Sequence, residues 1–197
     1  MSEFTTPITL SAPAARLAPL AHEHEAALCE AARDGELWQL WYTSVPSPEG
    51  MAAEIERRLG LQAKGSMLPF TVFDADGKVV GMTTFMNIDA VHRRVEIGST
   101  WYARGAQRGP LNTTCKRLLL AHAFETLQCI AVELRTHRLN QQSRRAIERI
   151  GAQLDGILRN HLRAADGSLR DTAVYSITAD EWPAVRSHLD WQLVKPR

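Results

Sequence analysis

The chain has 197 residues, a length that allows one domain with at most a small appendage. Hydrophobic residues make up 45% and charged residues 23%, which is a globular mix and excludes a disordered or fibrous protein. The net charge of +1 gives no general attraction to nucleic acid or to an anionic membrane surface, so we expect neither partner.

Neither membrane insertion nor a disulfide framework is indicated. No apolar run approaches the ~18 residues that a membrane span needs, and Glu3 stands where a signal peptide would carry positive charge. The three cysteines, Cys29, Cys115 and Cys129, are widely spaced and form no CxxC pair. We therefore expect a reduced, cytoplasmic protein without a metal site.

The first half of the chain predicts helices followed by strands. Residues 1–14 lack periodicity and are expected to form a loose arm before a domain over residues 15–180. A short strand is predicted over 15–20 and helices over 22–33 and 48–63, the second capped by Ser47. Antiparallel strands should follow from about 68 to 103, with Asp74-Ala75-Asp76-Gly77 as a hairpin turn.

The second half alternates between the two element types. A helix is predicted over 111–127 with Asn112 as its cap, a strand over 131–136, and a helix over 140–151 closed by Gly151. Two strands then surround a turn at residues 165–167, and the tail over 181–197 should hold a last short helix. This order predicts one mixed α/β sheet with helices packed on it.

The turn from Arg104 to Asn112 is the first candidate site, because it joins a strand to the start of a helix. Unpaired N–H groups and the helix dipole make such a place suited to a diphosphate. Pro110 donates nothing, but its neighbours carry N–H groups and two arginines add positive charge. Many strand–turn–helix units bind no ligand, so this pattern alone leaves the site open.

Four segments in unbroken order carry a more specific signal. They are VEIGSTWY, RGAQRGPLNTTCKRLLLAHAFE, VELRTHRLNQQSRRAIERIGA and LDGILRNHLRAADGSLRDTAVYSI. Together they resemble the GNAT family of acetyl-CoA-dependent N-acetyltransferases over about residues 10 to 180. The likeness is greatest to the branch of ribosomal-protein N-terminal acetyltransferases. It implies a single α+β domain with a mostly antiparallel central sheet and helices on both faces.

The resemblance also implies which residues would hold the cosubstrate acetyl-CoA. The strand from Ser99 to Ala103 would separate from its neighbour at a bulge and pair with the pantetheine arm. An N–H near Trp101 or Tyr102 would polarise the thioester carbonyl. Asn140 would bond the pantetheine arm and Ser143 would lie near the sulfur. The cosubstrate-binding set comprises Thr100, Trp101, Tyr102, Arg104, Arg108, Gly109, Leu111, Asn112, Thr113, Asn140 and Ser143.

Acetyl transfer to an amine also needs a proton acceptor. Glu96 is the only acidic residue within the central strand, and we hypothesise that it accepts the amine proton through water. An ion pair with Arg93, Arg94 or a residue of a neighbouring strand is the alternative role for this carboxylate. Ser143 would donate a hydrogen bond to the leaving thiolate. The sequence departs from the family in its phosphate loop and in having no tyrosine between Tyr102 and Tyr175 to protonate that thiolate.

The acceptor is the least readable part of the sequence. Trp38, Trp41 and Tyr42 are expected to line its pocket, although a core or dimer contact would also explain them. We expect an N-acetyltransferase that acts on a small-molecule amine or a protein N-terminus by direct transfer in a ternary complex. The alternative is a non-catalytic acyl-CoA-binding or interaction module. Trp182, Leu189 and Trp191 further suggest a homodimer.

Overall fold

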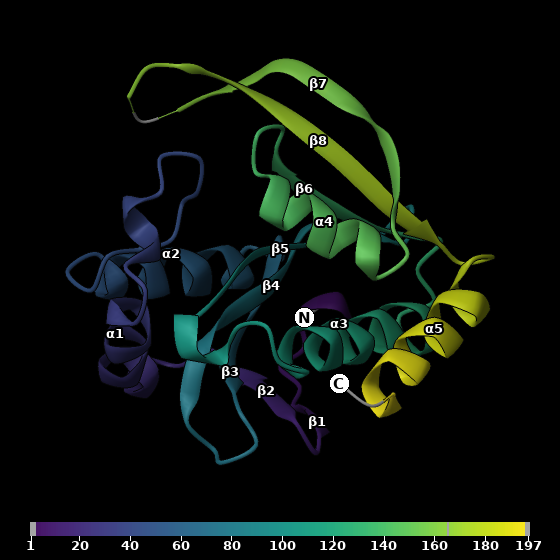
Figure 1. Cartoon of the computed structure of the whole chain (residues 1–197), viewed down its shortest axis with the longest axis horizontal. Helices are drawn as coiled ribbons and strands as arrows, with labels where there is room; N and C mark the ends of the chain where they lie inside the picture. The colour runs from purple at the N-terminus through teal and green to yellow at the C-terminus, as the bar shows by residue number, and fades with distance from the viewer. Residues whose placement is uncertain (1–2, 165, 196–197) are drawn as a thin grey trace.

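The computed structural model describes residues 3–164 and 166–195, which form a single eight-stranded sheet covered by helices (Figure 1). The strands are β1 Leu10–Ala12, β2 Ala15–Pro19, β3 Met67–Phe73, β4 Val79–Asp89, β5 Arg94–Tyr102, β6 Ala131–His137, β7 Gln153–Arg163 and β8 Leu169–Thr178. The helices are α1 Glu25–Arg33, α2 Met51–Ala63, α3 Leu111–Ala121, α4 Gln141–Arg149 and α5 Trp182–Val194. Short helical turns are η1 Glu3–Thr5, η2 His22–His24, η3 Leu37–Gln39, η4 Arg104–Ala106 and η5 His122–Thr126.

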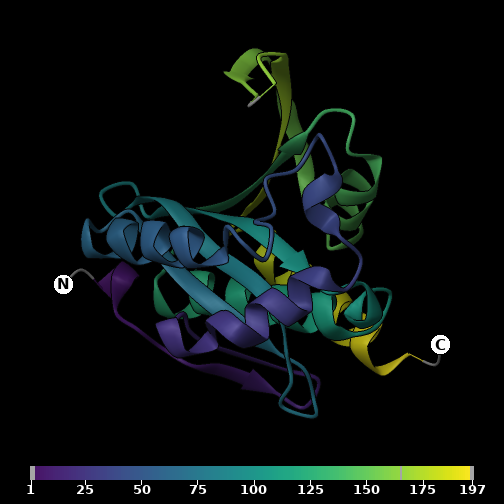
Figure 2. The ribbon, with the colours of Figure 1, turned by 90° about the vertical axis from the view of Figure 1, so that its left-hand side faces the viewer.

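The strands lie in the order β1-β2-β3-β4-β5-β6-β8-β7. Every neighbouring pair is antiparallel except β5 and β6, which run parallel because α3 and η5 connect them on one face. The predicted mixed, mostly antiparallel sheet is therefore confirmed. The β7–β8 hairpin extends away from the rest of the molecule (Figures 1 and 2). Its predicted turn includes residue 165, which lies outside the described residues.

Two apolar clusters fix the sheet between its helices. The larger one joins α3, α4 and α5 to one face and includes Phe70, Leu119, Ile147 and Leu189. The smaller one joins α1 and α2 to the opposite face (Figure 2). Helices therefore cover both faces, as the resemblance implies. Beyond β5 the described residues form no such cluster on the α1–α2 side, and that face carries mainly charged residues with Leu158 and Val174.

The N-terminal segment packs more closely than the loose arm expected from its sequence. Phe4 is 2% exposed within the larger cluster, and the Arg93 guanidinium lies 5.8 Å from the centre of its ring. Leu10–Ala12 then pairs with β2 as an edge strand. Lack of periodicity over residues 1–14 hid both contacts, because one buried aromatic and three paired residues are too few to create a repeating pattern.

The C-terminal helix explains most of the residues that suggested a dimer. Trp182 and Leu189 are buried against the larger cluster, and the Trp182 indole stacks on Phe124 at 5.4 Å. Only Trp191 of the three stays exposed, at 56%. The helix spans Trp182–Val194 and is longer than the expected short one. Trp182 and Leu189 complete the core of one chain, so these two residues no longer suggest a second copy.

Burial of Phe4 makes a first prediction. Replacing Phe4 by Ala should lower the free energy of unfolding by about 3 kcal/mol, because a buried aromatic side chain is removed from a packed core. Denaturant unfolding followed by circular dichroism measures this change. The matched control is Val91→Ala, since Val91 is 87% exposed and its loss should cost less than about 0.5 kcal/mol. Equal stabilities for the two variants would contradict the packed arm.

Candidate functional site

The most unusual feature of the sheet is the short pairing between its two parallel strands. β5 and β6 are in register at only three positions, Arg94 with Ala131, Val95 with Val132 and Glu96 with Glu133. Both strands continue, to Tyr102 and His137, without further pairing to each other. The last residues of β5 consequently present backbone N–H and C=O groups on this side for another extended chain to pair with.

A bulge in β5 accompanies this separation. Met82 pairs with Trp101 and Thr84 pairs with Gly98, so one β4 residue faces the two residues Ser99 and Thr100. Ser99 has a φ of 48°, in the left-handed region. Both the separation and the bulge agree with what the family resemblance implies for this strand.

The side chains beyond the bulge point into the protein. Thr100 bonds the Thr83 hydroxyl at 2.7 Å, Trp101 packs in the smaller cluster and Tyr102 in the larger one. Trp101 and Tyr102 are 4% and 8% exposed. These three positions, expected to contact acetyl-CoA, can therefore do so mainly through the backbone of β5.

Glu96 stands at the last paired position before the strands separate. Its side chain is 6% exposed, and its Oε2 accepts a hydrogen bond from Asn87 Nδ2 at 2.7 Å and lies 3.4 Å from Arg135 Nε. No described residue bonds Oε1, which is directed along the strand over Gly98. A Cβ at Gly98 would lie 2.8 Å from that oxygen, so glycine leaves room for the carboxylate.

The environment of Glu96 favours its neutral form. Burial raises the pKa of Glu96 above its usual value, against the hydrogen bond from Asn87 and the attraction of Arg135. The alternative ion pair of Glu96 is formed with a residue of the neighbouring strand, Arg135 on β6, and not with Arg93 or Arg94. Arg94 instead bonds Glu133 at 2.7 Å. A buried carboxylate with one unbonded oxygen and a raised pKa is a better proton acceptor than an ordinary carboxylate.

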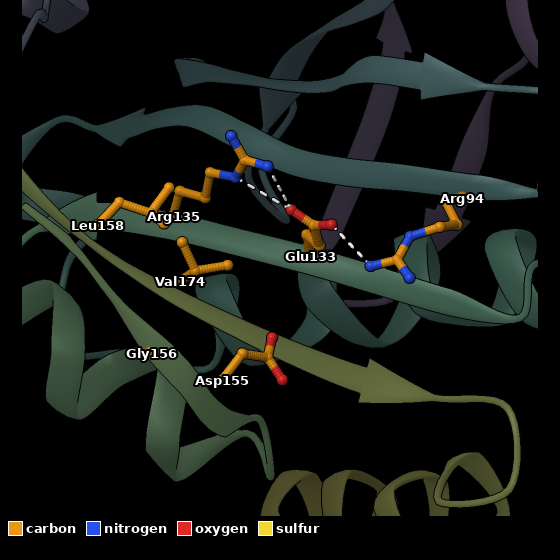
Figure 3. A pocket seen from close by; sticks show the side chains of 7 residues that line it. All are labelled: Arg94, Glu133, Arg135, Asp155, Gly156, Leu158 and Val174. Atoms are coloured by element: carbon orange, nitrogen blue, oxygen red, sulfur yellow. Dashed lines mark hydrogen bonds and ion pairs between the residues drawn. The ribbon is translucent and has the colours of Figure 1, made fainter. Parts of the chain in front are cut away.

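A charged groove continues from Glu96 across the C-terminal half of the sheet. A cavity of about 210 Å³ reaches Asn87, Asp89, Glu96 and Arg135, and an adjoining one of about 320 Å³ reaches Asp155 and Val174. Figure 3 shows Glu133 between Arg94 and Arg135 on the shared wall. The wall residues alternate along the strands with residues of the larger cluster, so the groove lies on the face opposite α4.

The pKa values of Glu133 and Glu96 are shifted in opposite directions, although the two residues are direct neighbours across the parallel pair. Burial disfavours its charge, but hydrogen bonds from Arg135 and Arg94 outweigh burial and lower the pKa of Glu133. Glu133 is thus held ionised between two guanidinium groups. The same wall therefore contains one carboxylate suited to accept a proton and one that fixes two cations.

The turn after β5 is held by contacts that the sequence did not predict. Asp34, which follows α1, accepts two hydrogen bonds from this turn. The Arg104 N–H donates to the Asp34 carbonyl oxygen at 2.9 Å, and the Gly105 N–H donates to Asp34 Oδ2 at 2.8 Å. Gln107 donates from Nε2 to the carbonyl of Tyr102 at 2.9 Å. These bonds fix the turn against both the end of β5 and α1, and they join segments some 70 residues apart.

The helix after this turn begins at Leu111, as expected, but its N-cap lies two residues before the predicted cap Asn112. Pro110 is the N-cap of α3, Leu111 is its first residue, and no side chain caps it. Asn112 is therefore inside the first turn, and the predicted cap role is wrong. The first N–H groups of a helix have no intrahelical partner, so Leu111, Asn112 and Thr113 offer backbone donors to an anion.

The start of α4 lies beside this turn. Asn140 caps the helix, with its Oδ1 accepting from the Ser143 N–H at 3.0 Å, and its Nδ2 remains for another acceptor. Gln142 Nε2 donates to Gln107 Oε1 at 3.5 Å and links the two segments directly. The structure thus brings Asn140 and Ser143 to the same opening as the Arg104–Thr113 segment.

The three aromatic residues expected at an acceptor pocket are divided between two roles. Trp38 packs against the smaller apolar cluster. Trp41 is 59% exposed and contacts Tyr42 edge to face at 5.5 Å and His137 at 5.0 Å. The loop between α1 and α2 therefore reaches the far end of β6. Trp41 and Tyr42 stand at the opening, whereas Trp38 belongs to the core.

Sequence reasoning missed Asn87, Arg135 and Asp34. Asn87 and Arg135 meet Glu96 only because of the strand register, and no local pattern marks them. Within residues 3–164 and 166–195 no group of three or more His, Cys, Asp or Glu side chains has the arrangement of a metal site. None of the helices in these ranges has both the length and the apolar character of a membrane span.

Comparison with known proteins agrees with this geometry. The model of the acetyltransferase (GNAT) domain family matches residues 15–153. The Bacillus subtilis protein "Putative ribosomal N-acetyltransferase YdaF" is 35% identical over 107 residues, which are 54% of this chain and 57% of that protein. The chain thus spans less than two thirds of this relative.

Solved structures share the whole fold. A GCN5-related N-acetyltransferase from Brucella melitensis is 29% identical with a TM-score of 0.85, covering 96% of this chain and 86% of that one. Mycobacterium smegmatis RimJ, solved in complex with CoA-disulfide, is 24% identical with a TM-score of 0.78, covering 94% and 93%. The likeness to RimJ concerns the fold alone. With the family model matching most of its length, the chain belongs to the GNAT family of acetyltransferases.

Proposed function

We propose that this protein transfers an acetyl group from acetyl-CoA to a primary amine, with both substrates bound at once. The observation that carries the proposal is the position of Glu96. Its unbonded carboxylate oxygen lies where β5 and β6 separate, between the phosphate-binding turn and the charged groove. One face of this opening suits the cosubstrate and the other suits the amine.

Acetyl-CoA would bind along the separated end of β5. The pantetheine arm pairs with the backbone from Ser99 to Ala103, and Asn140 Nδ2 bonds the same arm. The pyrophosphate binds at the start of α3, where backbone donors are available and cations are near. The residues proposed for it are Arg104, Arg108, Gly109, Leu111, Asn112 and Thr113.

The chemical step needs no covalent enzyme intermediate. The ammonium form of the amine loses a proton to Glu96, directly or through water, and the neutral nitrogen attacks the thioester carbonyl. The second N–H proton passes to solvent as the amide forms. A backbone N–H at Trp101 or Tyr102 stabilises the oxygen while the new C–N bond forms and the C–S bond breaks. Coenzyme A leaves as a thiolate. Holding both substrates in contact supplies much of the rate.

No tyrosine is available to protonate the leaving thiolate. The Tyr175 hydroxyl is engaged between Arg144 and Glu148, at 2.8 Å from each, and the Tyr102 side chain is buried in the core. Neither is placed to donate to the sulfur. We therefore assign the hydrogen bond to Ser143, whose hydroxyl stabilises the thiolate until solvent protonates it.

The acceptor would enter along the charged groove beside Trp41 and Tyr42. Arg170 on β8 interacts electrostatically with Glu96, and its buried Nε has no hydrogen-bond partner among the described residues. An arginine donor and fixed carboxylates suit a peptide backbone better than an apolar amine. The name of the Bacillus subtilis relative refers to ribosomal acetylation. We infer that the acceptor is a protein N-terminus.

Cosubstrate binding gives the first test of this proposal. Coenzyme A and acetyl-CoA at about 100 times their Kd should stabilise the protein by about 2.7 kcal/mol, which raises its Tm by about 5–10 °C. ATP and NAD, which lack the pantetheine arm, should raise it much less. A scanning fluorimetry panel measures the four shifts. A larger shift with ATP or NAD would indicate a nucleotide-binding domain instead.

Glu96→Gln tests the proposed base. Turnover of acetyl-CoA with an N-terminal peptide should fall at least about 100-fold, while the Kd for coenzyme A stays unchanged. Burial raises the pKa of Glu96 in the folded protein, so the folded state favours the protonated carboxyl. This contribution to stability is present at low pH and is lost as the pH rises through the folded-state pKa, and the ionised carboxylate then reduces stability. The neutral variant should consequently keep or raise the wild-type Tm at pH 7.

Glu133→Gln is the matched control, because Glu133 neighbours Glu96 but is held ionised and should not act as a base. It should keep most of the turnover. Wild-type turnover in Glu96→Gln would remove Glu96 from the mechanism. Tight coenzyme A binding without turnover of any amine in the wild type would favour the non-catalytic acyl-CoA-binding module.

A further inference from the structure

Two buried cations contact the β5 bulge, and the reaction as described uses neither. The first is Arg58 on α2, whose side chain is 1% exposed. Its Nη1 donates to Thr84 Oγ1 at 2.6 Å and its Nη2 donates to the Ser99 carbonyl at 3.3 Å. Its Nε donates to Glu54 Oε1 at 2.7 Å, so the guanidinium is neutralised on its own helix. Arg58 therefore binds both strands at the irregular position.

The second cation is Lys116 on α3, which is 6% exposed. Its Nζ donates to Thr100 Oγ1 at 3.0 Å, and that hydroxyl also bonds Thr83 Oγ1 at 2.7 Å. No carboxylate of the described residues forms an ion pair with Lys116. Burial lowers its pKa to about 8, which records the cost of keeping this amine in the core.

The two cations approach from opposite sides of the sheet. Thr83 and Thr84 are consecutive on β4, so their side chains point to opposite faces, and α2 and α3 cover those two faces. Arg58 holds Ser99 and Lys116 holds Thr100, which are the two residues opposite Thr83. Each half of the bulge is thus bonded by one helix.

Stability alone does not account for these residues. Burying a cation costs free energy, and apolar residues of similar size often replace buried charges without loss of stability. A leucine or methionine would fill either position at less cost. Unlike an apolar side chain, each cation fixes the position of one particular oxygen of the bulge, because a hydrogen bond depends on distance and angle.

We propose that Arg58 and Lys116 are positioning residues that fix the β5 bulge from both faces, and so hold the backbone N–H groups at Trp101 and Tyr102 in place for the acyl thioester. The inference rests on the proposed acetyl transfer. The cations touch neither substrate. They act through Ser99 and Thr100 on the strand that lines the opening. A displacement of about 1 Å there can cost about 100-fold in rate.

The test compares Arg58→Met and Lys116→Met with two controls on the same helices. Arg57→Met removes a cation that bonds the same Glu54, and Arg117→Met removes one that pairs with Asp190. Neither control contacts the bulge. The two bulge variants should lose about 10- to 100-fold in kcat while their Kd for coenzyme A changes little, since the pyrophosphate site is intact. Both controls should keep the wild-type kcat.

Three further readouts separate positioning from a merely structural role. Lys116→Met should match or exceed the wild-type Tm, because a buried charge is removed. Thr100→Val combined with Lys116→Met should lower kcat no more than Lys116→Met alone, since the two act through one hydrogen bond. Amide hydrogen exchange at residues 99–102 of the ligand-free protein should be faster in both bulge variants, with β3 unchanged.

Each remaining outcome contradicts a specific claim. Unchanged kcat in both bulge variants would overturn the positioning role, as would a loss of kcat that follows Tm equally in the bulge variants and the controls. Additive effects of Thr100→Val and Lys116→Met would overturn the route through Thr100. A wild-type protein that binds no coenzyme A would contradict the proposed function instead. The exchange measurement would then still decide whether the cations fix the bulge.

Discussion

The organising constraint of this structure is a parallel strand pair that stops after three positions. Backbone groups of a sheet require partners, and β5 loses its partner on one side beyond Glu96. The protein does not cover this edge with a further strand. α3 begins next to it and α4 lies across from it, so the unpaired backbone meets two helix N-termini. An extended, anionic molecule satisfies both kinds of group at once.

Charge burial is concentrated at the same place. Glu96, Arg58 and Lys116 are each nearly inaccessible to solvent, and all three lie on or beside β5 between positions 96 and 100. The other buried polar residues in the described part of the chain are threonines, Ser176, Gln192 and His137. Desolvated charges reduce stability, so a fold selected only for stability would place apolar residues there. The buried charges at the strand opening therefore distinguish the candidate site from the rest of the fold.

Local patterns predicted the elements well, because helical and strand periodicity and turn residues act over short distances. The hairpin at Asp74–Gly77 is an example, since Asp74 Oδ1 accepts from the N–H groups of Asp76 and Lys78. The family likeness predicted the bulge in β5, which the strand register confirms. What remained hidden depends on register: the Glu96 partners Asn87 and Arg135 come from two other strands. No sequence spacing indicates such contacts.

The packing also explains why one sheet can serve two substrates. Helices cover both faces of the N-terminal half, but only one face of β6 and β8 is covered by a helix, and β7 is exposed along nearly its whole length. The opening between β5 and β6 joins the covered side, with α3 and α4, to the uncovered charged groove. In the proposed reaction, a cosubstrate bound on the first side would present its acyl carbon to the second. Glu96 lies on the groove side. The proton would therefore leave the amine on the face opposite the departing thiolate, and different elements would stabilise the two charges of the transition state.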